Sequence, residues 1–468
     1  MIDFAFLQSL INEVVNYWRE SIRTVFSLTP EDFLNIIWPT LLFDFPRYNL
    51  ASWVAVFAEI FDKKGLRRKE AFKRRLLANP PLVSVLIPTY NEGEHIFATI
   101  ASLKRQSYPN IEIIVVNDGS IDNTGQIIDL LKGDNVRVVH ANSNQGKAFA
   151  HNMGYYLCNG EYIMVCDGDT VFDRDAVLEV LLPFSDSRVR AVAGNLQVKN
   201  EKANLLTRLQ ALEYLFSIDM GRRFSARVDI LPIISGAFGV FRADVVKKVG
   251  GWSVSPGDDS DMTTCVRKLG HRVDFAPRAI AYTDVPINIR SLIRQRLRWS
   301  RSPVTVRLRK HGELLFRQIA WKNFRLKNLL SIWNLVLYRF IFGCGVVVMF
   351  IYITIFSTDL LLPLFIVISA FYTSFDMLHF AAAFILSRDR HKILPLVIYI
   401  PIFWLYMGIF MKTITVLGFF DEILFRGSYS NYYVPRRVLR VKPRWGMRDP
   451  FKNIRPESIE KLIGKTAK

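Results

Sequence analysis

Short apolar runs alternate with longer amphipathic stretches through the part of the chain that begins at Leu82. Four of the runs are bounded by turn residues and predict buried strands, at Leu82–Pro88, Glu112–Asn117, Val136–His140 and Tyr162–Cys166. Helical patterns separate them near residues 94–105, 122–132 and 147–157. This alternation predicts an α/β domain with a parallel sheet, helices on both faces and ligands at the carboxyl ends of the strands.

Longer apolar stretches lie on both sides of this domain. Residues 33–61 are long enough to cross a bilayer of roughly 30 Å. Polar residues between Asp44 and Asn49 interrupt them, so we expect either one kinked span or a segment that lies partly in the interface. Residues 1–32 predict an amphipathic surface helix. Downstream, the apolar pattern predicts two spans, at residues 330–357 and 360–386.

Residues 393–425 are apolar enough to cross the membrane once, but Pro401 breaks the first half and Lys412 lies within the second. The link before this stretch and the tail after it are both basic. Because basic flanks stay in the cytoplasm, we favour a hairpin or re-entrant segment that keeps the tail in the cytosol. A single span would place the tail outside. The link Ser357-Thr358-Asp359 has no basic residue, so we expect it outside.

The composition indicates a soluble domain joined to a few membrane helices, because 50% of the 468 residues are hydrophobic and 22% are charged. The formal net charge of +19 favours anionic partners. Nucleic acid is not expected, since the basic residues crowd beside apolar segments as cytoplasmic flanks do. The basic run at residues 62–79 therefore places the next domain in the cytosol. Four cysteines without paired spacing suit a reducing compartment, and no cleavable signal peptide is expected.

These patterns divide the chain into six segments. They are an N-terminal amphipathic and membrane segment (1–61), a basic linker (62–80), the α/β domain (81–285), interfacial helices (286–328), a transmembrane or re-entrant region (329–425) and a basic cytosolic tail (426–468). The interfacial segment is basic and aromatic after Arg301, as helices that lie on a membrane surface are.

Carboxylates follow two of the predicted strands. Asp167 and Asp169 come directly after the fourth strand, and Asp118 follows the second. Two carboxylates one residue apart can share a hard divalent cation with nucleotide phosphates. Asp118 could belong to a turn, or it could accept hydrogen bonds from a base or ribose. Lys147 could simply begin a helix, or it could meet a phosphate, with Gly146 allowing close backbone approach.

Two further motifs carry candidate chemistry. Asp258-Asp259 could cap the start of a helix, or it could hold a general base whose pKa is raised by a like-charged neighbour. The run Gln295-Arg296-Leu297-Arg298-Trp299 packs two cations, an amide and a large aromatic into five residues shortly before the downstream apolar region. Such a cluster indicates an anion held beside a bilayer.

In this order the motifs resemble those of the processive, membrane-integrated family 2 glycosyltransferases, which include the cellulose, chitin, hyaluronan and poly-N-acetylglucosamine synthases. The residues that carry the resemblance are Pro88-Thr89-Tyr90-Asn91-Glu92, Asp118, Asn144 to Lys147, Asp167 with Asp169, Ser235-Gly236, Asp258-Asp259 and Gln295 to Trp299. The resemblance implies a GT-A, Rossmann-like glycosyltransferase domain in the cytosol, inserted between transmembrane and interfacial helices. The Gln-x-x-Arg-Trp motif downstream of two acidic motifs is its most specific feature.

The resemblance also implies a role for each motif. The uridine of a UDP-sugar would be held by Thr89, Tyr90, Asn91, Glu92 and Asp118. Asp167 and Asp169 would bring Mg²⁺ or Mn²⁺ to the diphosphate. Asp259, beside Asp258, would be the general base that deprotonates the acceptor hydroxyl for one-step inverting attack. Within the motif that begins at Gln295, Arg298 would stabilise the leaving diphosphate and Trp299 would present an apolar face to the acceptor sugar.

The tail holds one more match. Trp445-Gly446-Met447-Arg448 resembles the Trp-Gly-Thr-Arg gating-loop element of hyaluronan synthases, with Met447 as the departure. Trp445 and Arg448 would then close over the donor from a cytosolic tail, whereas a basic, disordered tail is the alternative. A second departure is Gly257-Asp258-Asp259, where poly-N-acetylglucosamine and cellulose synthases usually have Thr-Glu-Asp. That departure leaves the donor sugar open.

We therefore expect a multi-pass enzyme of the plasma (inner) membrane that polymerises a β-linked polysaccharide from a UDP-sugar and secretes it through its own pore. UDP-N-acetylglucosamine is the first choice of donor, and UDP-glucose, for a β-glucan, is the second. The expected partners are the donor, the growing polysaccharide and the lipid bilayer, and an accessory membrane subunit is allowed. A non-processive enzyme that glycosylates a lipid is the alternative. A catalytically inactive partner subunit is disfavoured by the intact Asp167, Asp169, Asp259 and Arg298.

Overall fold

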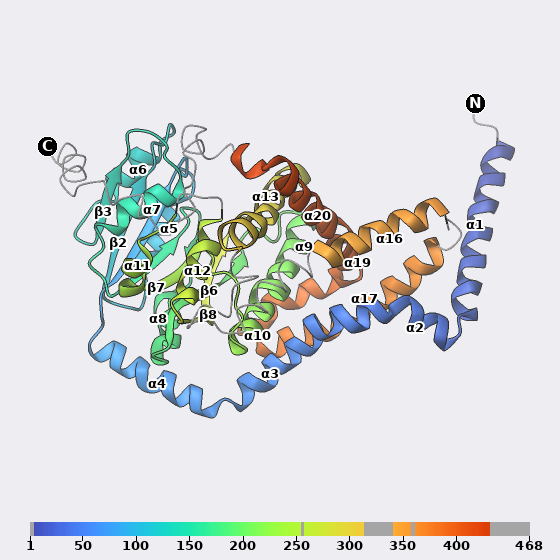
Figure 1. Cartoon of the computed structure of the whole chain (residues 1–468), viewed down its shortest axis with the longest axis horizontal. Helices are drawn as coiled ribbons and strands as arrows, with labels where there is room; N and C mark the ends of the chain where they lie inside the picture. Colours follow the sequence, from blue (N-terminus) through green and yellow to red (C-terminus); the bar gives the residue numbers. More distant parts are fainter. Residues whose placement is uncertain (1–3, 254–256, 313–339, 357–360, 431–468) are drawn as a thin grey trace.

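The computed structural model describes residues 4–253, 257–312, 340–356 and 361–430. A mixed eight-stranded sheet occupies one end of the molecule, and long helices extend from it toward the other end (Figure 1). The strands lie in the order β3-β2-β1-β4-β7-β6-β8-β5. Their bounds are β1 Val83–Thr89, β2 Ile111–Asn117, β3 Val136–His140, β4 Tyr162–Cys166, β5 Val171–Phe172, β6 Val189–Val198, β7 Phe238–Arg242 and β8 Arg272–Thr283.

The four strands predicted from the sequence are confirmed as β1 to β4, and they run parallel to one another. Along β1, Val85 and Ile87 belong to one hydrophobic cluster and Leu86 to the other, so both faces of the sheet are covered. Strands that are covered on both faces have nearly continuous apolar sequences, and these four strands could therefore be recognised from the sequence. The helices predicted between them are also present, as α5 Ile96–Lys104, α6 Thr124–Leu130 and α7 Lys147–Tyr155.

The second half of the sheet, for which no strands were predicted, contains antiparallel pairs. β7 runs antiparallel to both β4 and β6, and β5 runs antiparallel to β8, while β6 and β8 are parallel. The relative direction of two strands depends on how the connection between them runs. The apolar pattern within a strand carries no information about that connection. The helices of this second half are α8 Ala176–Leu181, η2 Leu182–Ser185, α9 Leu205–Glu213, η3 Tyr214–Met220, α10 Gly221–Arg227, α11 Ala243–Val249 and α12 Asp258–Lys268.

The N-terminal part is helical throughout its described length. After α1 (Phe4–Ser27), one continuous run joins three segments, which are α2 Pro30–Pro39, η1 Thr40–Leu50 and α3 Ala51–Phe61. η1 is π-helical and contains Pro46, whose missing N–H and bulky ring disturb the helical hydrogen bonds. The basic linker forms α4 (Lys63–Ala78), and its N-terminus is capped by Asp62, which accepts from the Gly65 amide at 2.9 Å.

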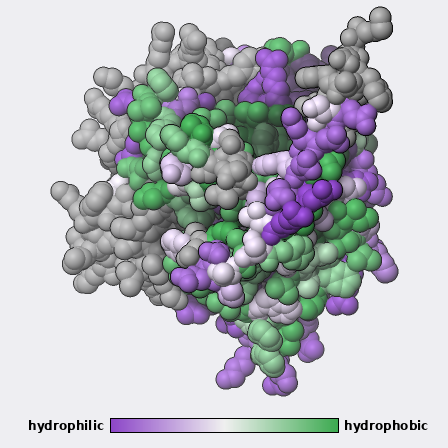
Figure 2. All heavy atoms as spheres, turned by 90° about the vertical axis from the view of Figure 1, so that its right-hand side faces the viewer, coloured by the Kyte–Doolittle hydropathy of each residue, from purple (hydrophilic) through white to green (hydrophobic). Residues whose placement is uncertain are grey.

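Among the described residues, two helices are long and apolar enough to cross a membrane, α17 (Leu361–Leu386) and the run Arg390–Phe425. α17 matches the span predicted at residues 360–386, and α16 (Gly343–Phe356) lies within the one predicted at 330–357. α17 lies beside the N-terminal helical run, as Figure 1 shows. Figure 2 views the far end of these helices, where broad apolar areas are crossed by hydrophilic side chains.

The run Arg390–Phe425 has 36 residues and no interrupting loop. Its segments are α18 Arg390–Ile393, η8 Leu394–Tyr399, α19 Ile400–Trp404, η9 Leu405–Met411, α20 Lys412–Phe420 and η10 Asp421–Phe425, and η11 Gly427–Ser430 follows. Of the predicted hairpin or re-entrant segment, the hairpin is not formed, because the helical run continues through Pro401, which lies near the start of α19. Lys412 does not end the helix either, since its Nζ lies 3.6 Å from Asp44 Oδ2.

α13 (Ile289–Ser302), which carries the Gln-x-x-Arg-Trp motif, packs along α20. A side chain at Gly418 would place its Cβ 2.6 Å from Ser300 Cβ, so the two helices touch closely. Arg301 Nε lies 2.6 Å from Asp421 Oδ2. The next segment, η4 (Pro303–Lys310), also differs from the expected interfacial helix, because its buried Arg307 donates to Pro232 O at 2.6 Å within the α/β domain. Residues 313–328 of the expected interfacial stretch lie outside the described residues.

Candidate active site

The loops that follow β1 and β2 are joined to each other at the carboxyl edge of the sheet. The Asp118 amide donates to Thr89 O at 2.8 Å, and the Asn91 amide donates to Ser120 Oγ at 3.0 Å. Asn91 has a left-handed backbone (φ 56°), and its Oδ1 accepts from the Ile121 amide at 3.0 Å. Thr89 is buried, Tyr90 is half-buried and Asn91 is exposed. The residues predicted to bind uridine therefore lie on two adjoining loops.

Asp118 shapes the backbone that leads into α7. Its Oδ1 accepts from the Gln145 amide at 2.8 Å, and its Oδ2 accepts from the Gly146 amide at 2.7 Å. Burial raises the pKa of this carboxyl, and the two amide donors oppose the rise. Gly146 adopts φ 95°, a conformation that favours glycine, and Lys147 follows as the first residue of α7. Asp118 thus fixes the loop from which Lys147 projects.

Lys147 meets the first acidic motif. Its Nζ donates to Asp167 Oδ1 at 2.5 Å, and the two side chains are 37% and 38% exposed, so a ligand can reach them. Burial acts to raise the pKa of Asp167, but the Lys147 ammonium outweighs it and holds that pKa below its usual range. Burial, followed by the charge of Asp167, raises the pKa of Asp169 to about 6.

Glu92 faces the same motif from the loop after β1. Burial, followed by the charges of Asp169 and Asp167, raises its pKa to about 8. A Cβ on Gly168 would lie 3.0 Å from Glu92 Cγ, so the Glu92 side chain extends across the turn between the two aspartates. Thr99 Oγ1 holds that turn by donating to Gly168 O at 2.7 Å. Carboxylates that repel one another in this way are a donor set that suits a hard divalent cation.

The second acidic motif lies against the same lysine. Asp258 and Asp259 begin α12, after Gly257 with φ 85°. A Cβ on Gly236 would lie 2.8 Å from Lys147 Nζ and would collide with Asp259 Oδ1, so the glycine allows these two charged groups to approach. Burial raises the pKa of Asp259 against the opposing charge of Lys147. Burial, followed by the charge of Asp259, raises the pKa of Asp258 to about 7.

α13 presents the last motif toward this site. Arg298 and Trp299 are exposed, Gln295 is half-buried and Arg296 is buried. The charge of Arg298 acts to lower the pKa of both Asp167 and Asp259, which places its guanidinium in the electrostatic reach of both acidic motifs. A cation so placed can stabilise negative charge that develops between the two motifs.

The structure therefore brings together most of the residues predicted to act. The residues that meet around Lys147 are Glu92, Asp167, Asp169, Asp258, Asp259 and Arg298. Trp445 and Arg448, the predicted gating-loop residues, lie outside the described residues.

Sequence reasoning missed a half-buried cation on α10, Arg222. Burial lowers the pKa of Arg222 to about 10, and the nearby Tyr214 and Asp259 oppose that lowering. Its Nη1 donates to Gly194 O at 3.4 Å. The next residue, Arg223, instead forms ion pairs with Asp219 at 2.7 Å and Glu59 at 2.6 Å. The sequence contains no local signal that distinguishes these two adjacent arginines. Only the fold shows that Arg222 lies near the site and that Arg223 forms structural ion pairs.

A compact group of candidate metal ligands lies elsewhere on α12. Single ligand atoms of Asp261, Cys265 and His311 fall within 4.8 Å of one another. Asp261 is already paired, because its Oδ2 accepts from Lys310 Nζ at 2.6 Å and its Oδ1 faces His311 Nε2 at 2.7 Å. An ammonium at ligand distance disfavours a cation there. The expected metal pair stays Asp167 with Asp169.

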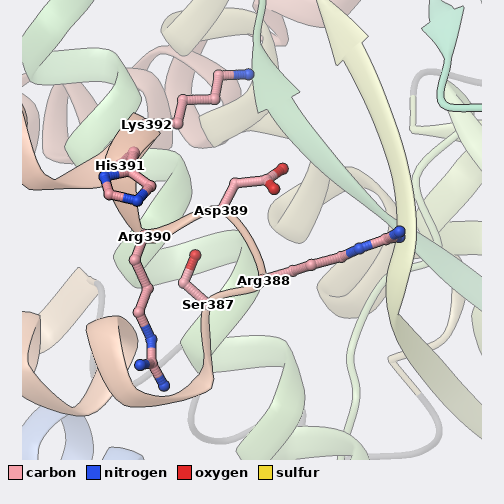
Figure 3. A pocket seen from close by; sticks show the side chains of 6 residues that line it. All are labelled: Ser387, Arg388, Asp389, Arg390, His391 and Lys392. Carbon is pink, nitrogen blue, oxygen red and sulfur yellow. The ribbon is translucent and has the colours of Figure 1, made fainter.

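A cavity of about 590 Å³ lies at the link between α17 and the run Arg390–Phe425, lined by Ser387 to Lys392. Figure 3 shows that the basic side chains of this link point in different directions, with Arg388 directed toward the sheet. Arg388 Nη1 lies 3.7 Å from Asp173 Oδ2, and Lys392 Nζ lies 4.0 Å from the centre of the Tyr282 ring. This cavity belongs to the contact between the helices and the sheet edge, and it is separate from the acidic motifs.

Known proteins resemble this chain over the region that holds the site. The model of the family described as Glycosyl transferase family 2 matches residues 84–250. A poly-beta-1,6-N-acetyl-D-glucosamine synthase of Staphylococcus epidermidis is 32% identical over 275 residues, which cover 56% of this chain and 66% of that protein. The enzyme of the same description from Staphylococcus aureus is 33% identical over 230 residues, covering 48% and 56%. The match thus spans less than two thirds of the length of these relatives.

Among solved structures, the chain is similar to a mannosyltransferase from Pyrobaculum calidifontis in complex with GDP-Man and Mn²⁺. The TM-score is 0.49 at 18% identity, with 81% of this chain and 99% of that chain covered. The family match and the sheet of this chain agree with the expected α/β domain of the GT-A type.

Proposed function

Since this chain contains a family 2 glycosyltransferase domain at residues 84–250, we propose that the whole protein polymerises a β-linked polysaccharide from a UDP-sugar by a processive, inverting reaction. The observation that carries the proposal is the convergence of both acidic motifs on Lys147, with Arg298 in reach of each. UDP-N-acetylglucosamine is the proposed donor, because the similar synthases are described as makers of poly-beta-1,6-N-acetyl-D-glucosamine.

The donor would bind across the carboxyl edge of the parallel strands. Its uridine would lie against the loops that hold Thr89 to Glu92 and Asp118, and its diphosphate would approach Lys147 and Arg298. Asp167 and Asp169, with Glu92 beside them, would hold Mg²⁺ or Mn²⁺. When bound there, the metal ion would neutralise charge on the diphosphate. Burial and the charge of Asp167 raise the pKa of Asp169, so a cation at this site relieves a repulsion already present in the fold.

Asp259 would act as the general base. Its carboxylate accepts the proton of the acceptor hydroxyl while that oxygen forms a bond to the anomeric carbon of the donor sugar. The bond between that carbon and the diphosphate oxygen breaks on the opposite face, so the configuration inverts and UDP leaves with both electrons of that bond. Arg298 stabilises the charge on the departing diphosphate. Burial raises the pKa of Asp259, which makes its carboxylate a stronger base for this proton transfer.

Trp299 would hold the end of the growing polymer. It lies one residue from Arg298 and is 43% exposed, so an aromatic face is available next to the leaving-group site. α13 packs along α20, which belongs to one of the two helices long and apolar enough to cross a membrane. We propose a multi-pass inner-membrane enzyme with a cytosolic catalytic domain, whose helices give the polymer a way out, with or without an accessory membrane subunit.

A donor screen tests this function. The purified full-length protein in lipid is incubated with each radiolabelled UDP-sugar and with Mg²⁺ or Mn²⁺. UDP-N-acetylglucosamine should give a high-mass product. One UDP should be released for each sugar residue that is incorporated into the polymer. High-mass product from UDP-glucose alone would instead assign a β-glucan. A product of one sugar on a lipid would contradict the processive reaction and favour the glycolipid-forming alternative.

A further inference from the structure

Glu213, at the end of α9, joins the motif helix to the run Arg390–Phe425. Its Oε2 accepts from Arg296 Nη2 at 2.9 Å and from the Tyr406 hydroxyl at 2.7 Å. The three residues come from α9, α13 and η9. They are buried, with exposures of 9% for Glu213, 3% for Arg296 and 5% for Tyr406. We call them the Glu213 triad.

Arg296 also contacts the acceptor-side aromatic. Its Cζ lies 4.2 Å from the centre of the Trp299 ring, three residues further along the same helix. A guanidinium at this distance is attracted to the face of an indole, and positions three apart on a helix are neighbours. Trp299 nevertheless remains 43% exposed. One face of the ring is therefore held by Arg296, while surface remains open for a ligand.

The triad is buried between helices and consists of residues other than those assigned to the donor site. The three residues are at most 9% exposed, whereas the acidic motifs surround Lys147, whose side chain is 37% exposed. A planar guanidinium that is fixed by a carboxylate keeps one orientation, and the Tyr406 hydroxyl fixes the carboxylate in turn. Tyr406, a residue of the Arg390–Phe425 helix, therefore fixes the orientation of the Trp299 ring through Glu213 and Arg296.

Resting on the proposed function, we propose that the Glu213 triad positions Trp299 on the terminal sugar of the growing polymer, so that it controls how long the polymer stays engaged. Each transfer step uses Asp259 and Arg298, and neither residue belongs to the triad. Loss of the triad should therefore weaken the hold on the acceptor, whereas donor binding should be unaffected.

The test compares Tyr406→Phe and Arg296→Met with the matched control Tyr399→Phe in full-length protein reconstituted into lipid vesicles. Tyr406→Phe removes only the hydroxyl that donates to Glu213, and Arg296→Met removes the cation on the Trp299 face. Tyr399 lies on the same helix, and its ring, which phenylalanine keeps, is 5.3 Å from Arg208 Cζ. For each protein we would measure product length, the KM for UDP-N-acetylglucosamine, the KM for a short N-acetylglucosamine oligosaccharide acceptor and the thermal unfolding midpoint.

The expected result is a split between the two substrates. The acceptor KM should rise about fivefold to tenfold in Tyr406→Phe and Arg296→Met, with product length falling by a similar factor, as expected when one aromatic contact is lost. The donor KM and the unfolding midpoint of Tyr406→Phe should equal those of Tyr399→Phe. Arg296→Lys, which keeps a cation over the ring, should recover part of the acceptor affinity that Arg296→Met loses.

Two results would overturn the proposal. One is equal acceptor KM and product length in Tyr406→Phe, Arg296→Met and Tyr399→Phe. The other is a parallel loss of donor affinity, acceptor affinity and unfolding midpoint, which would assign the triad to folding. If the wild-type protein transfers only one sugar, the processive function fails, but the acceptor KM values still decide whether the triad positions Trp299.

Discussion

Lys147 lies between two acidic motifs that are far apart in the chain. Its Nζ is 2.5 Å from Asp167 Oδ1, and the missing side chain of Gly236 leaves room for it next to Asp259. The Lys147–Asp167 neighbourhood could be anticipated, since α7 and β4 belong to the same alternating pattern. The approach of Asp259 could not, because α12 reaches the site only through the antiparallel half of the sheet. At the residue scale, the charged groups could be identified from the sequence, whereas their contacts with one another are visible only in the folded structure.

Replacement of the proposed general base, Asp259, gives a direct test of the proposed transfer. Asp259→Asn keeps the size of the side chain but cannot accept the acceptor proton, so polymer synthesis should fall by about 10²–10⁴-fold. UDP binding, measured by isothermal titration, should be retained. Asp244→Asn, a change of a 46% exposed carboxylate on α11, is the control and should leave synthesis unchanged. Synthesis at the wild-type rate in Asp259→Asn would remove Asp259 as the base.

The same contacts predict a shift in the pH dependence of synthesis. The Lys147 ammonium opposes the burial that raises the pKa of Asp259, so its removal should raise that pKa further. A base must be deprotonated to act, and the acid limb of the pH–rate profile should therefore move to higher pH in Lys147→Met. Lys147→Arg keeps the charge and should leave the limb in place. An unchanged limb or a shift to lower pH in Lys147→Met would contradict this electrostatic role.

At the element scale, the contact between α13 and α20 is the closest link between the motif helix and the Arg390–Phe425 run. Gly418 faces Ser300, and a Cβ there would lie 2.6 Å from Ser300 Cβ. Arg301 with Asp421, at 2.6 Å, and Arg309 with Glu422 add ion pairs at the end of the same contact. These contacts couple the position of the Gln-x-x-Arg-Trp motif to that of α20.

Gly418→Ala should disturb this contact. The added methyl group meets Ser300 and the helix backbone, so the two helices must separate slightly, at a cost of about 1–3 kcal/mol. Synthesis and the thermal unfolding midpoint should both fall. Gly408→Ala is the matched control on the same helix, because its Cβ would meet only Trp404 Cε3 at an ordinary 3.8 Å. Equal behaviour of the two variants would show that the α13–α20 contact tolerates a side chain.

The elements that sequence predicted correctly are those with a strong local signal. β3 and β4 have the predicted bounds, because each is a short apolar run with turn residues at both ends. β6 and β8 were not predicted, although they form the longest pairing in the sheet. Their strand character depends on partners brought together by the fold, and a single-sequence pattern contains no such partners. The same limit explains why η4 was expected on the membrane surface when Arg307 is buried in the α/β domain.

At the scale of the whole molecule, the run Arg390–Phe425 contacts β8 of the α/β domain near its start and η4 near its end. Lys392, near its start, lies over the Tyr282 ring of β8, and Glu422, near its end, pairs with Arg309 of η4. The sequence analysis expected entry and exit on one face of the membrane because both flanks are basic. The hairpin is not formed, and the face of the membrane on which each end of the run lies stays a prediction.

Labelling of engineered cysteines tests this arrangement. In a variant without the native Cys158, Cys166, Cys265 and Cys344, single cysteines replace Asp389 and Phe425, both exposed. We expect neither to react with a membrane-impermeant maleimide applied to intact cells, and both to react after lysis. Ser357→Cys, in the link that the sequence places outside, should react in intact cells. Reaction of the Phe425→Cys protein before lysis would mean that the run crosses the membrane.

The α13–α20 contact has a consequence for the medium in which the enzyme works. A helix embedded in a bilayer, whichever face its ends lie on, responds to the hydrocarbon thickness of the surrounding lipid by changing its tilt. Because Gly418 packs against α13 and Asp421 pairs with Arg301, a tilt of α20 would also displace Trp299 on α13. Acyl-chain length would then act as an external control on polymer length, through a helix that holds neither the proposed base nor the donor. Vesicles of thin and thick lipid should therefore yield different chain lengths from the same protein and the same donor concentration.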